Sequence, residues 1–174
     1  MNALGINHGR SGNISLRVPD GFLITPTGMD YATLKPADIV AMDMDGHAKP
    51  GRAPSSEWPM HRAILRGRAD ANAIVHTHSP SATALACLRR AIPRFHYMVA
   101  AAGGESIRCA PYALYGSEEL ARHALAALDG RKACLLANHG MVALGADVDA
   151  ALRLALEVEK LAEQYLLARQ AGEP

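Results

Sequence analysis

The sequence predicts a single α/β domain in which a central, mostly antiparallel β-sheet is flanked by helices. Three observations lead to this fold class. A chain of 174 residues suits one ordinary domain with a buried core. Short apolar runs separated by turn residues fill its first third, and capped helical segments recur in the remainder. No repeat, low-complexity segment or linker divides the sequence, so we expect one domain over residues 1–174.

The strand signals come first along the chain. Apolar runs bounded by Gly, Pro and Asp residues predict a small antiparallel meander with strands at 14–18, 21–25 and 39–42. Two further strands are expected at 73–78 and 133–137, and the second leads through a short turn into another apolar stretch. His76 and His78 lie in the first of these strands, and His139 lies in the turn after the second.

Helices are expected where capping residues precede amphipathic segments. Ser79 suits an N-cap and is followed by a proline, which predicts a helix over 80–88. A second helix is expected from Ser117 to a glycine stop at Gly130. The apolar spacing over 147–170 predicts one long amphipathic helix, whose buried stripe covers the sheet or a neighbouring subunit.

Composition excludes several classes of partner. The 18 basic and 17 acidic residues give a net charge of +1, which provides no electrostatic footprint for nucleic acid or an anionic membrane. No apolar run approaches the ~20 residues that cross a bilayer, and the first residues do not resemble a secretory signal. The three cysteines are odd in number and lack a C-x-x-C spacing, so we expect reduced packing residues and a cytoplasmic location.

Three histidines and a glutamate form a candidate metal site. His76 and His78 lie two residues apart on a predicted strand, so both side chains point to one face and can hold one ion. His139, from a separate segment, supplies a third imidazole and leaves a coordination position open for substrate. Glu57 falls in the first turn of a helix expected over 56–66. Taken singly, each histidine can also be a packing residue, and Glu57 an ordinary helix-start carboxylate.

Three turns precede the histidines in the sequence and share small residues, hydroxyl groups and exposed backbone N–H groups. They cover residues 9–13, 25–28 and 54–57. These are the components of an anion-binding nest, which favours a phosphate ligand. Each turn alone is equally compatible with an ordinary cap or hairpin.

The order of these motifs, continued through 95–104 and 109–112 into the last helix, resembles the class II aldolase/adducin family over nearly the whole chain. The resemblance implies the fold of that family and a bound Zn²⁺, or another divalent metal, held by His76, His78 and His139. It also implies that Glu57 is the catalytic acid/base and a further contact of the resting metal. Members of the family begin with an additional helix and end with a C-terminal tail, and we expect this chain to lack both.

The resemblance extends to the substrate side of the site. The phosphate group of a sugar is expected to lie against Gly12, Asn13, Thr27, Gly28, Ser55 and Ser56. Tyr97 is expected to act near the aldehyde end of the site in a neighbouring subunit of a homotetramer, although an interface aromatic is the competing interpretation. Tyr115 is expected to help position the aldehyde. We expect His61, one helical turn after Glu57, to be a packing residue.

The function implied by the resemblance is reversible cleavage of a ketose 1-phosphate, such as L-fuculose 1-phosphate or a related deoxy-ketose phosphate. The products are dihydroxyacetone phosphate and an aldehyde, formed through a zinc-stabilised enediolate. Other reactions of the family remain open: pentulose-phosphate 4-epimerase, methylthioribulose-phosphate dehydratase and sugar-acid phosphate decarboxylase. The epimerase generally has aspartate where this chain has Glu57. A noncatalytic, adducin-like interaction module is the alternative from a different class.

Overall fold

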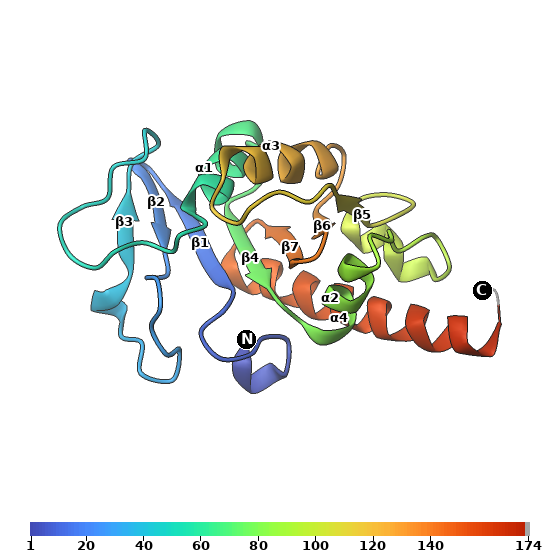
Figure 1. Cartoon of the computed structure of the whole chain (residues 1–174). Coiled ribbons are helices and arrows are strands. Elements are labelled where there is room, and N and C mark those ends of the chain that lie inside the picture. The colour runs from blue at the N-terminus through green and yellow to red at the C-terminus, as the bar shows by residue number, and fades with distance from the viewer. Residues whose placement is uncertain (173–174) are drawn as a thin grey trace.

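Seven strands form one sheet in the computed structural model of the chain, which describes residues 1–172 (Figure 1). Their spatial order is β3-β2-β1-β4-β7-β6-β5, and only β5 and β6 run parallel. The predicted mostly antiparallel sheet is therefore confirmed. The strands are β1 (Asn13–Val18), β2 (Gly21–Ile24), β3 (Val40–Met42), β4 (Ala73–Thr77), β5 (Arg108–Ala110), β6 (Ala133–Leu136) and β7 (Gly140–Gly145).

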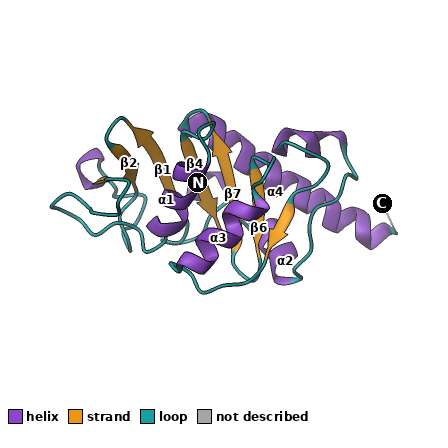
Figure 2. Ribbon diagram, turned by 90° about the horizontal axis from the view of Figure 1, so that it is seen from above, coloured by secondary structure: helices purple, strands orange, loops and turns teal. Residues whose placement is uncertain are grey.

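Helices cover both faces of the sheet, as Figures 1 and 2 show. One hydrophobic core joins α1 and α3 to the sheet, and a second core joins α2 and α4 to its opposite face. Across residues 1–172, no helix combines the length and apolar character needed to cross a bilayer. The helices are α1 (Trp58–Gly67), α2 (Pro80–Cys87), α3 (Glu118–Ala127) and α4 (Val148–Ala171), with the 3₁₀ helices η1 (Asn2–Leu4), η2 (Pro36–Asp38) and η3 (Tyr97–Ala102).

The alternation of β4 determines which face receives the candidate metal ligands. Ala73 and Val75 pack into the α2/α4 core, whereas Ile74 packs into the α1/α3 core. His76 continues this alternation on the α1/α3 side, because residues two apart on a strand share a face. The strand is buried along its whole length, so His76 reaches the site from inside the fold.

The start of α1 differs slightly from the sequence prediction. Glu57 is the N-cap residue and precedes the helix, rather than lying in its first turn. The helix begins at Trp58, the one tryptophan of the sequence, and the guanidinium of Arg62 lies 4.8 Å from the centroid of the Trp58 ring. A cation over an indole face at this distance is stabilising, so Arg62 helps to hold the first turn of α1 in place.

One local prediction is wrong, one is confirmed with a different capping partner, and some short elements were not predicted. Ser79 occupies the N-cap of α2, as expected, but its side chain makes no capping bond. Instead, Glu159 on α4 accepts from the backbone N–H groups of Ser81 and Ala82 at 2.8 and 2.9 Å. Cys87 is exposed and is not a packing residue. The short strand β5 and the 3₁₀ helix η3 were not predicted. β5 has only three residues, which carry too little periodicity for a strand assignment.

Candidate metal centre and active site

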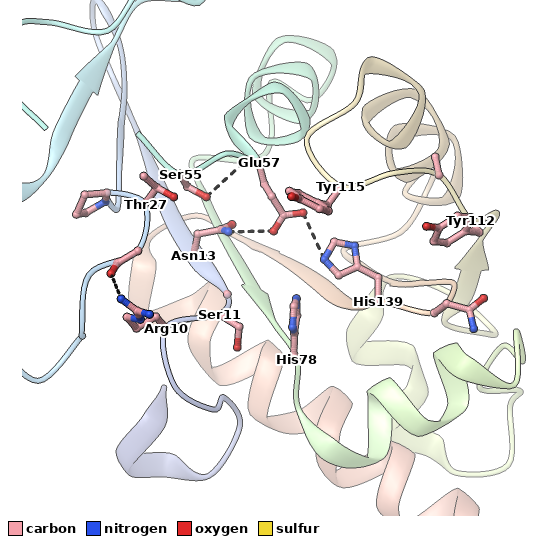
Figure 3. Close-up of a pocket in the computed structure, with 15 residues that line it drawn as sticks. Arg10, Ser11, Asn13, Thr27, Ser55, Glu57, His78, Tyr112, Tyr115 and His139 are labelled. Atoms are coloured by element: carbon pink, nitrogen blue, oxygen red, sulfur yellow. Dashed lines mark hydrogen bonds and ion pairs between the residues drawn. The ribbon is translucent and has the colours of Figure 1, made fainter. Parts of the chain in front are cut away.

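Glu57, His76, His78 and His139 meet at one end of β4. One potential ligand atom from each residue lies within 4.8 Å of the others. The three imidazole centroids are 4.8 to 5.0 Å apart. Glu57 is buried, and it faces His139 in Figure 3. The structure therefore brings together all four residues of the candidate metal site.

The turn between β6 and β7 delivers His139 to this cluster. Asn138 adopts a left-handed backbone with φ 57°, a conformation that asparagine tolerates better than most residues. At Gly140, a Cβ atom would lie 2.4 Å from the carbonyl oxygen of Thr77 and 2.9 Å from the His78 ring. A side chain at Gly140 would thus push the turn away from β4. Close backbone approach places His139 beside His78.

The sheet register fixes the orientation of His76. Its Nδ1 lies 2.9 Å from the carbonyl oxygen of Met141 on β7. A carbonyl only accepts hydrogen bonds, so Nδ1 carries a hydrogen and donates it. In the neutral ring, Nε2 is then a lone pair directed at Nε2 of His78, 3.1 Å away, and at Oε2 of Glu57, 3.0 Å away. A hydrogen bond to the outer nitrogen is the usual way in which proteins orient a metal-binding imidazole.

Electrostatics favour ionised Glu57 beside two neutral histidines. Burial opposes ionisation of Glu57, but its interactions with His76, His139 and Asn13 outweigh burial and lower the pKa. Burial, reinforced by His76, lowers the pKa of both His78 and His139 to about 4. Burial also opposes protonation of His76, yet Glu57 raises its pKa above the ordinary value. The cluster therefore attracts one positive charge to a point between Glu57 and His76.

This donor set fits a divalent cation. Two imidazole nitrogens on one tetrahedral zinc ion, each at ~2.0–2.1 Å, lie roughly 3.3 Å apart. The corresponding distance between His76 and His78 is 3.1 Å. Oε1 of Glu57 is buried without a hydrogen bond among the described residues, although Nε2 of His139 lies 3.4 Å away. Three imidazoles and a carboxylate are ligands that zinc accepts in catalytic sites.

A cavity of about 280 Å³ opens beside this cluster. The three candidate phosphate turns all reach its wall, through Ser11, Gly12, Asn13, Thr27, Gly28 and Ser55. Figure 3 shows the side chains of Ser11, Thr27 and Ser55 on the side of the cavity away from His139. Ser56 is exposed and does not line the cavity. The turns that the sequence grouped by composition thus form one surface in space.

The other side of the cavity is aromatic. Tyr112, Ala113 and Tyr115 line it near His139, and the two tyrosines are exposed (Figure 3). Tyr97 lies elsewhere, on η3, where it is 81% exposed, and it does not line the cavity of its own chain. The structure therefore groups Tyr115 with the metal cluster and leaves Tyr97 outside it.

Six further residues line the cavity but were given no site role from the sequence: Arg10, Ser11, Pro26, Tyr112, Ala113 and Asn138. Nη1 of Arg10 donates to the carbonyl oxygen of Gly28 at 2.9 Å and so bridges two of the three turns. Arg10 is the one lysine or arginine among the described residues that line the cavity. The sequence could have indicated Arg10 through its position in the first turn (residues 9–13), because a guanidinium beside an anion nest favours a phosphate ligand.

His61 is a buried residue, as expected, but its contacts are polar. It lies on α1 with no exposed surface, and its ring nitrogens approach Ser15 Oγ at 2.6 Å and Asn13 Oδ1 at 2.5 Å. Asn13 Nδ2 in turn donates to Oε2 of Glu57 at 3.1 Å. Burial lowers the pKa of His61 to about 3, so the ring is neutral near pH 7.

Comparisons with known proteins agree with this geometry. The family model described as the class II aldolase and adducin N-terminal domain matches residues 1–166. A 5-methylthioribulose-1-phosphate/5-deoxyribulose-1-phosphate aldolase of Rhodospirillum rubrum is 56% identical over 174 residues, covering 100% of this chain and 79% of the relative. An L-fuculose phosphate aldolase of Escherichia coli K12 is 49% identical, covering 100% of this chain and 81% of the relative.

A solved structure of an L-fuculose 1-phosphate aldolase superposes with a TM-score of 0.94 at 44% identity. The match covers 97% of this chain and 81% of the solved one. The match to the family model covers every residue of the metal cluster and of the cavity wall. The chain therefore belongs to the class II aldolase and adducin family.

Proposed function

We propose that this protein is a metal-dependent aldolase that reversibly cleaves a ketose 1-phosphate into dihydroxyacetone phosphate and an uncharged aldehyde. The observation that carries the proposal is the layout of one cavity. A phosphate-binding wall and an aromatic wall flank a Glu/His cluster that fits a divalent cation. The named aldolase relatives and the solved neighbour support the same reaction class.

The phosphate is proposed to lie against the turns containing Gly12, Thr27 and Ser55, with Arg10 beside it. Backbone N–H groups and hydroxyls supply neutral donors, and the guanidinium adds a charge-assisted bond. Binding at this remote group orients the reacting carbons without large contacts of their own. Ser56 is left out of this set because it does not reach the cavity wall.

Glu57 is proposed to move the proton. In a ketose 1-phosphate the carbonyl carbon is C2, and the bond that breaks joins C3 to C4. Negative charge then develops on the three-carbon fragment that contains C1 to C3. A divalent cation held by His76, His78 and His139 would supply charge stabilisation at the oxygens of that fragment. In cleavage the hydroxyl on the departing carbon releases a proton as it becomes the aldehyde, and the fragment's carbon gains one. Burial opposes ionisation of Glu57, but His76, His139 and Asn13 lower its pKa, so its carboxylate can accept the released proton and deliver it to the fragment's carbon.

The aromatic wall suits the aldehyde end of the substrate. Tyr112, Ala113 and Tyr115 carry no charge at neutral pH and offer apolar surface, which favours a methyl or methylthiomethyl end over a second phosphate. We further propose a homotetramer in which Tyr97 reaches the site of a neighbouring subunit. Its 81% exposure, and its position outside the cavity of its own chain, support that assignment.

A product assay on a panel of sugar phosphates tests the proposal. The zinc-loaded protein is incubated with L-fuculose 1-phosphate, 5-deoxyribulose 1-phosphate and 5-methylthioribulose 1-phosphate. Ribulose 5-phosphate, which carries its phosphate at the opposite end of the sugar, is included for comparison. Dihydroxyacetone phosphate is measured by coupled NADH oxidation, and the aldehyde by trapping. We expect dihydroxyacetone phosphate from at least one ketose 1-phosphate. An epimerised, dehydrated or decarboxylated product without it would refute the aldolase assignment.

A further inference from the structure

A buried chain of three side chains lies behind Glu57. Ser15 contacts Nδ1 of His61, and Nε2 of His61 contacts Oδ1 of Asn13, whose Nδ2 reaches Oε2 of Glu57. Ser15 and His61 are at most 1% exposed, and Asn13 is 4% exposed. Solvent therefore does not compete for these hydrogen bonds.

The direction of every bond in this chain follows from its last member. An ionised carboxylate only accepts hydrogen bonds, so the NH₂ group of Asn13 must face Glu57. Its carbonyl oxygen then faces His61, so Nε2 of His61 must carry the hydrogen and donate it. In the neutral ring Nδ1 is the acceptor, and the Ser15 hydroxyl donates to it. If the Asn13 amide were reversed, its carbonyl oxygen would face the Glu57 carboxylate, and two hydrogen-bond acceptors would meet.

The fold holds the four residues in matched pairs. Asn13 and Ser15 are two apart on β1 and share a face, and Asn13 is directly opposite His76 on β4. Glu57 and His61 are four apart, at the N-cap and within the first turn and a half of α1, so they also lie on one side. Along the series of hydrogen bonds, the two residues from β1 therefore alternate with Glu57 and His61. The packing of α1 beside β1 sets the distances between them.

We propose that His61 is a positioning residue for Glu57. By donating to Asn13 Oδ1, it locks the Asn13 amide with its NH₂ group toward Oε2 and leaves Oε1 without a hydrogen bond. The carboxylate is thereby held in one rotamer, with one oxygen anchored and the other available to a substrate proton. This inference rests on the proposed function, in which Glu57 transfers the proton.

Two variants of His61 distinguish a positioning role from a purely structural one by their activity. His61→Leu keeps an apolar body of similar size but removes both hydrogen bonds. His61→Gln provides an amide that can donate to Asn13 and accept from Ser15. We expect His61→Leu to lower kcat about 10- to 100-fold, the usual effect of losing an outer-shell partner, with zinc content and KM near wild type. His61→Gln should recover most of kcat, and the exposed control His47→Leu should match wild type.

An activity-independent readout keeps the test separate from the substrate assignment. In ¹H–¹⁵N spectra, the Asn13 side-chain NH₂ pair is assigned by its loss in Asn13→Ser. We expect slow exchange with solvent in wild type and His61→Gln, and fast exchange in His61→Leu. Slow exchange that persists in folded His61→Leu, or full kcat in that variant with zinc bound, would overturn the proposal. If wild type cleaves no ketose 1-phosphate while the Asn13 pattern holds, the proposed function fails and the positioning role of His61 stands.

Discussion

The imidazole of His76 donates through Nδ1 to the carbonyl oxygen of Met141, at 2.9 Å, across the pairing of β4 with β7. Backbone register thereby sets the tautomer of a side chain in the metal cluster, because the carbonyl leaves Nε2 as the inward lone pair. A one-residue slip of this register would turn His76 to the opposite face of the sheet. The geometry of the candidate metal site therefore depends on the pairing of β4 with β7.

Metal binding is the first consequence to test. We expect the purified chain, after dialysis with zinc, to hold about one ion per chain and to melt at a higher temperature than the stripped protein. At free zinc about 1,000-fold above Kd, the gain in free energy of unfolding is about 4 kcal/mol. His76→Gln should abolish both effects, whereas the exposed control His47→Gln should retain them. Equal zinc content in the two variants would contradict the assignment of His76.

Replacing Glu57 by glutamine removes the proposed proton carrier while keeping the volume of the side chain. We expect Glu57→Gln to lower kcat about 10²- to 10⁴-fold, the range typical of general acid/base catalysis. Zinc content by metal analysis shows whether the three histidines still hold the ion. Glu118→Gln, at a position that is 69% exposed on its side chain, serves as the control and should keep full activity. A metal-loaded Glu57→Gln variant that turns over at the wild-type rate would remove Glu57 from its proposed role.

Arg10 is expected to contribute to recognition of the phosphate group. Loss of one charge-assisted hydrogen bond at an exposed side chain costs about 1.4 kcal/mol, so Arg10→Gln should raise KM about tenfold with little change in kcat. Arg10→Lys should fall in between, because it keeps the charge without the guanidinium fork. The exposed control Arg122→Gln should leave KM unchanged. Steady-state kinetics decide the point, and an unaltered KM in Arg10→Gln would place the phosphate elsewhere.

Tyr97 provides a test of assembly. If it acts in a neighbouring subunit, Tyr97→Phe and Glu57→Gln chains that are each weakly active should complement one another when co-expressed. Random mixing leaves about one quarter of the sites with an intact Glu57 and an intact partner Tyr97. We expect activity to rise toward that fraction, and light scattering should give a tetramer mass. Mixed assemblies no more active than the separate variants would assign Tyr97 to packing.

The pH dependence of stability should carry the signature of His61. Its pKa is about 3 in the folded protein, below the ordinary value of 6.5. Below pH 6.5 the unfolded chain binds a proton that the folded chain does not, so stability falls as the pH drops toward 3. Between pH 6.5 and pH 5 the loss is about 2 kcal/mol. Urea unfolding of His61→Gln, measured at several pH values, should show a smaller loss of stability between pH 6.5 and pH 5 than the wild type.

Local sequence signals predicted most of the elements around the site. Turn residues bounded β1 and β2, and the Ser117 side chain accepts from the backbone N–H of Leu120 as its N-cap position implies. Period-two alternation correctly placed His76 and His78 together. What could not be predicted depends on partners distant in the sequence: Glu159 caps α2 from 77 or 78 positions away, and no local pattern encodes such a contact.

The same limit applies within the site. Asn13 was expected at the phosphate, and it does line the cavity, yet its amide is committed to Glu57 and His61. That arrangement depends on hydrogen bonds from Glu57 and α1 to β1, between partners 44 and 48 positions apart in the sequence. Residue types indicated which side chains carry the chemistry, whereas the hydrogen-bond pattern that orients them needed the three-dimensional fold.

Trp58 gives the protein an optical reporter of its own. It is the one tryptophan of the sequence, it follows Glu57 directly, and the guanidinium of Arg62 fixes its ring. Indole emission from the unlabelled protein therefore arises at a single place, the first residue of α1. We therefore expect binding of a cation or of the proposed sugar phosphate, which would displace the neighbouring carboxylate, to change this emission on the stopped-flow timescale, without an added dye.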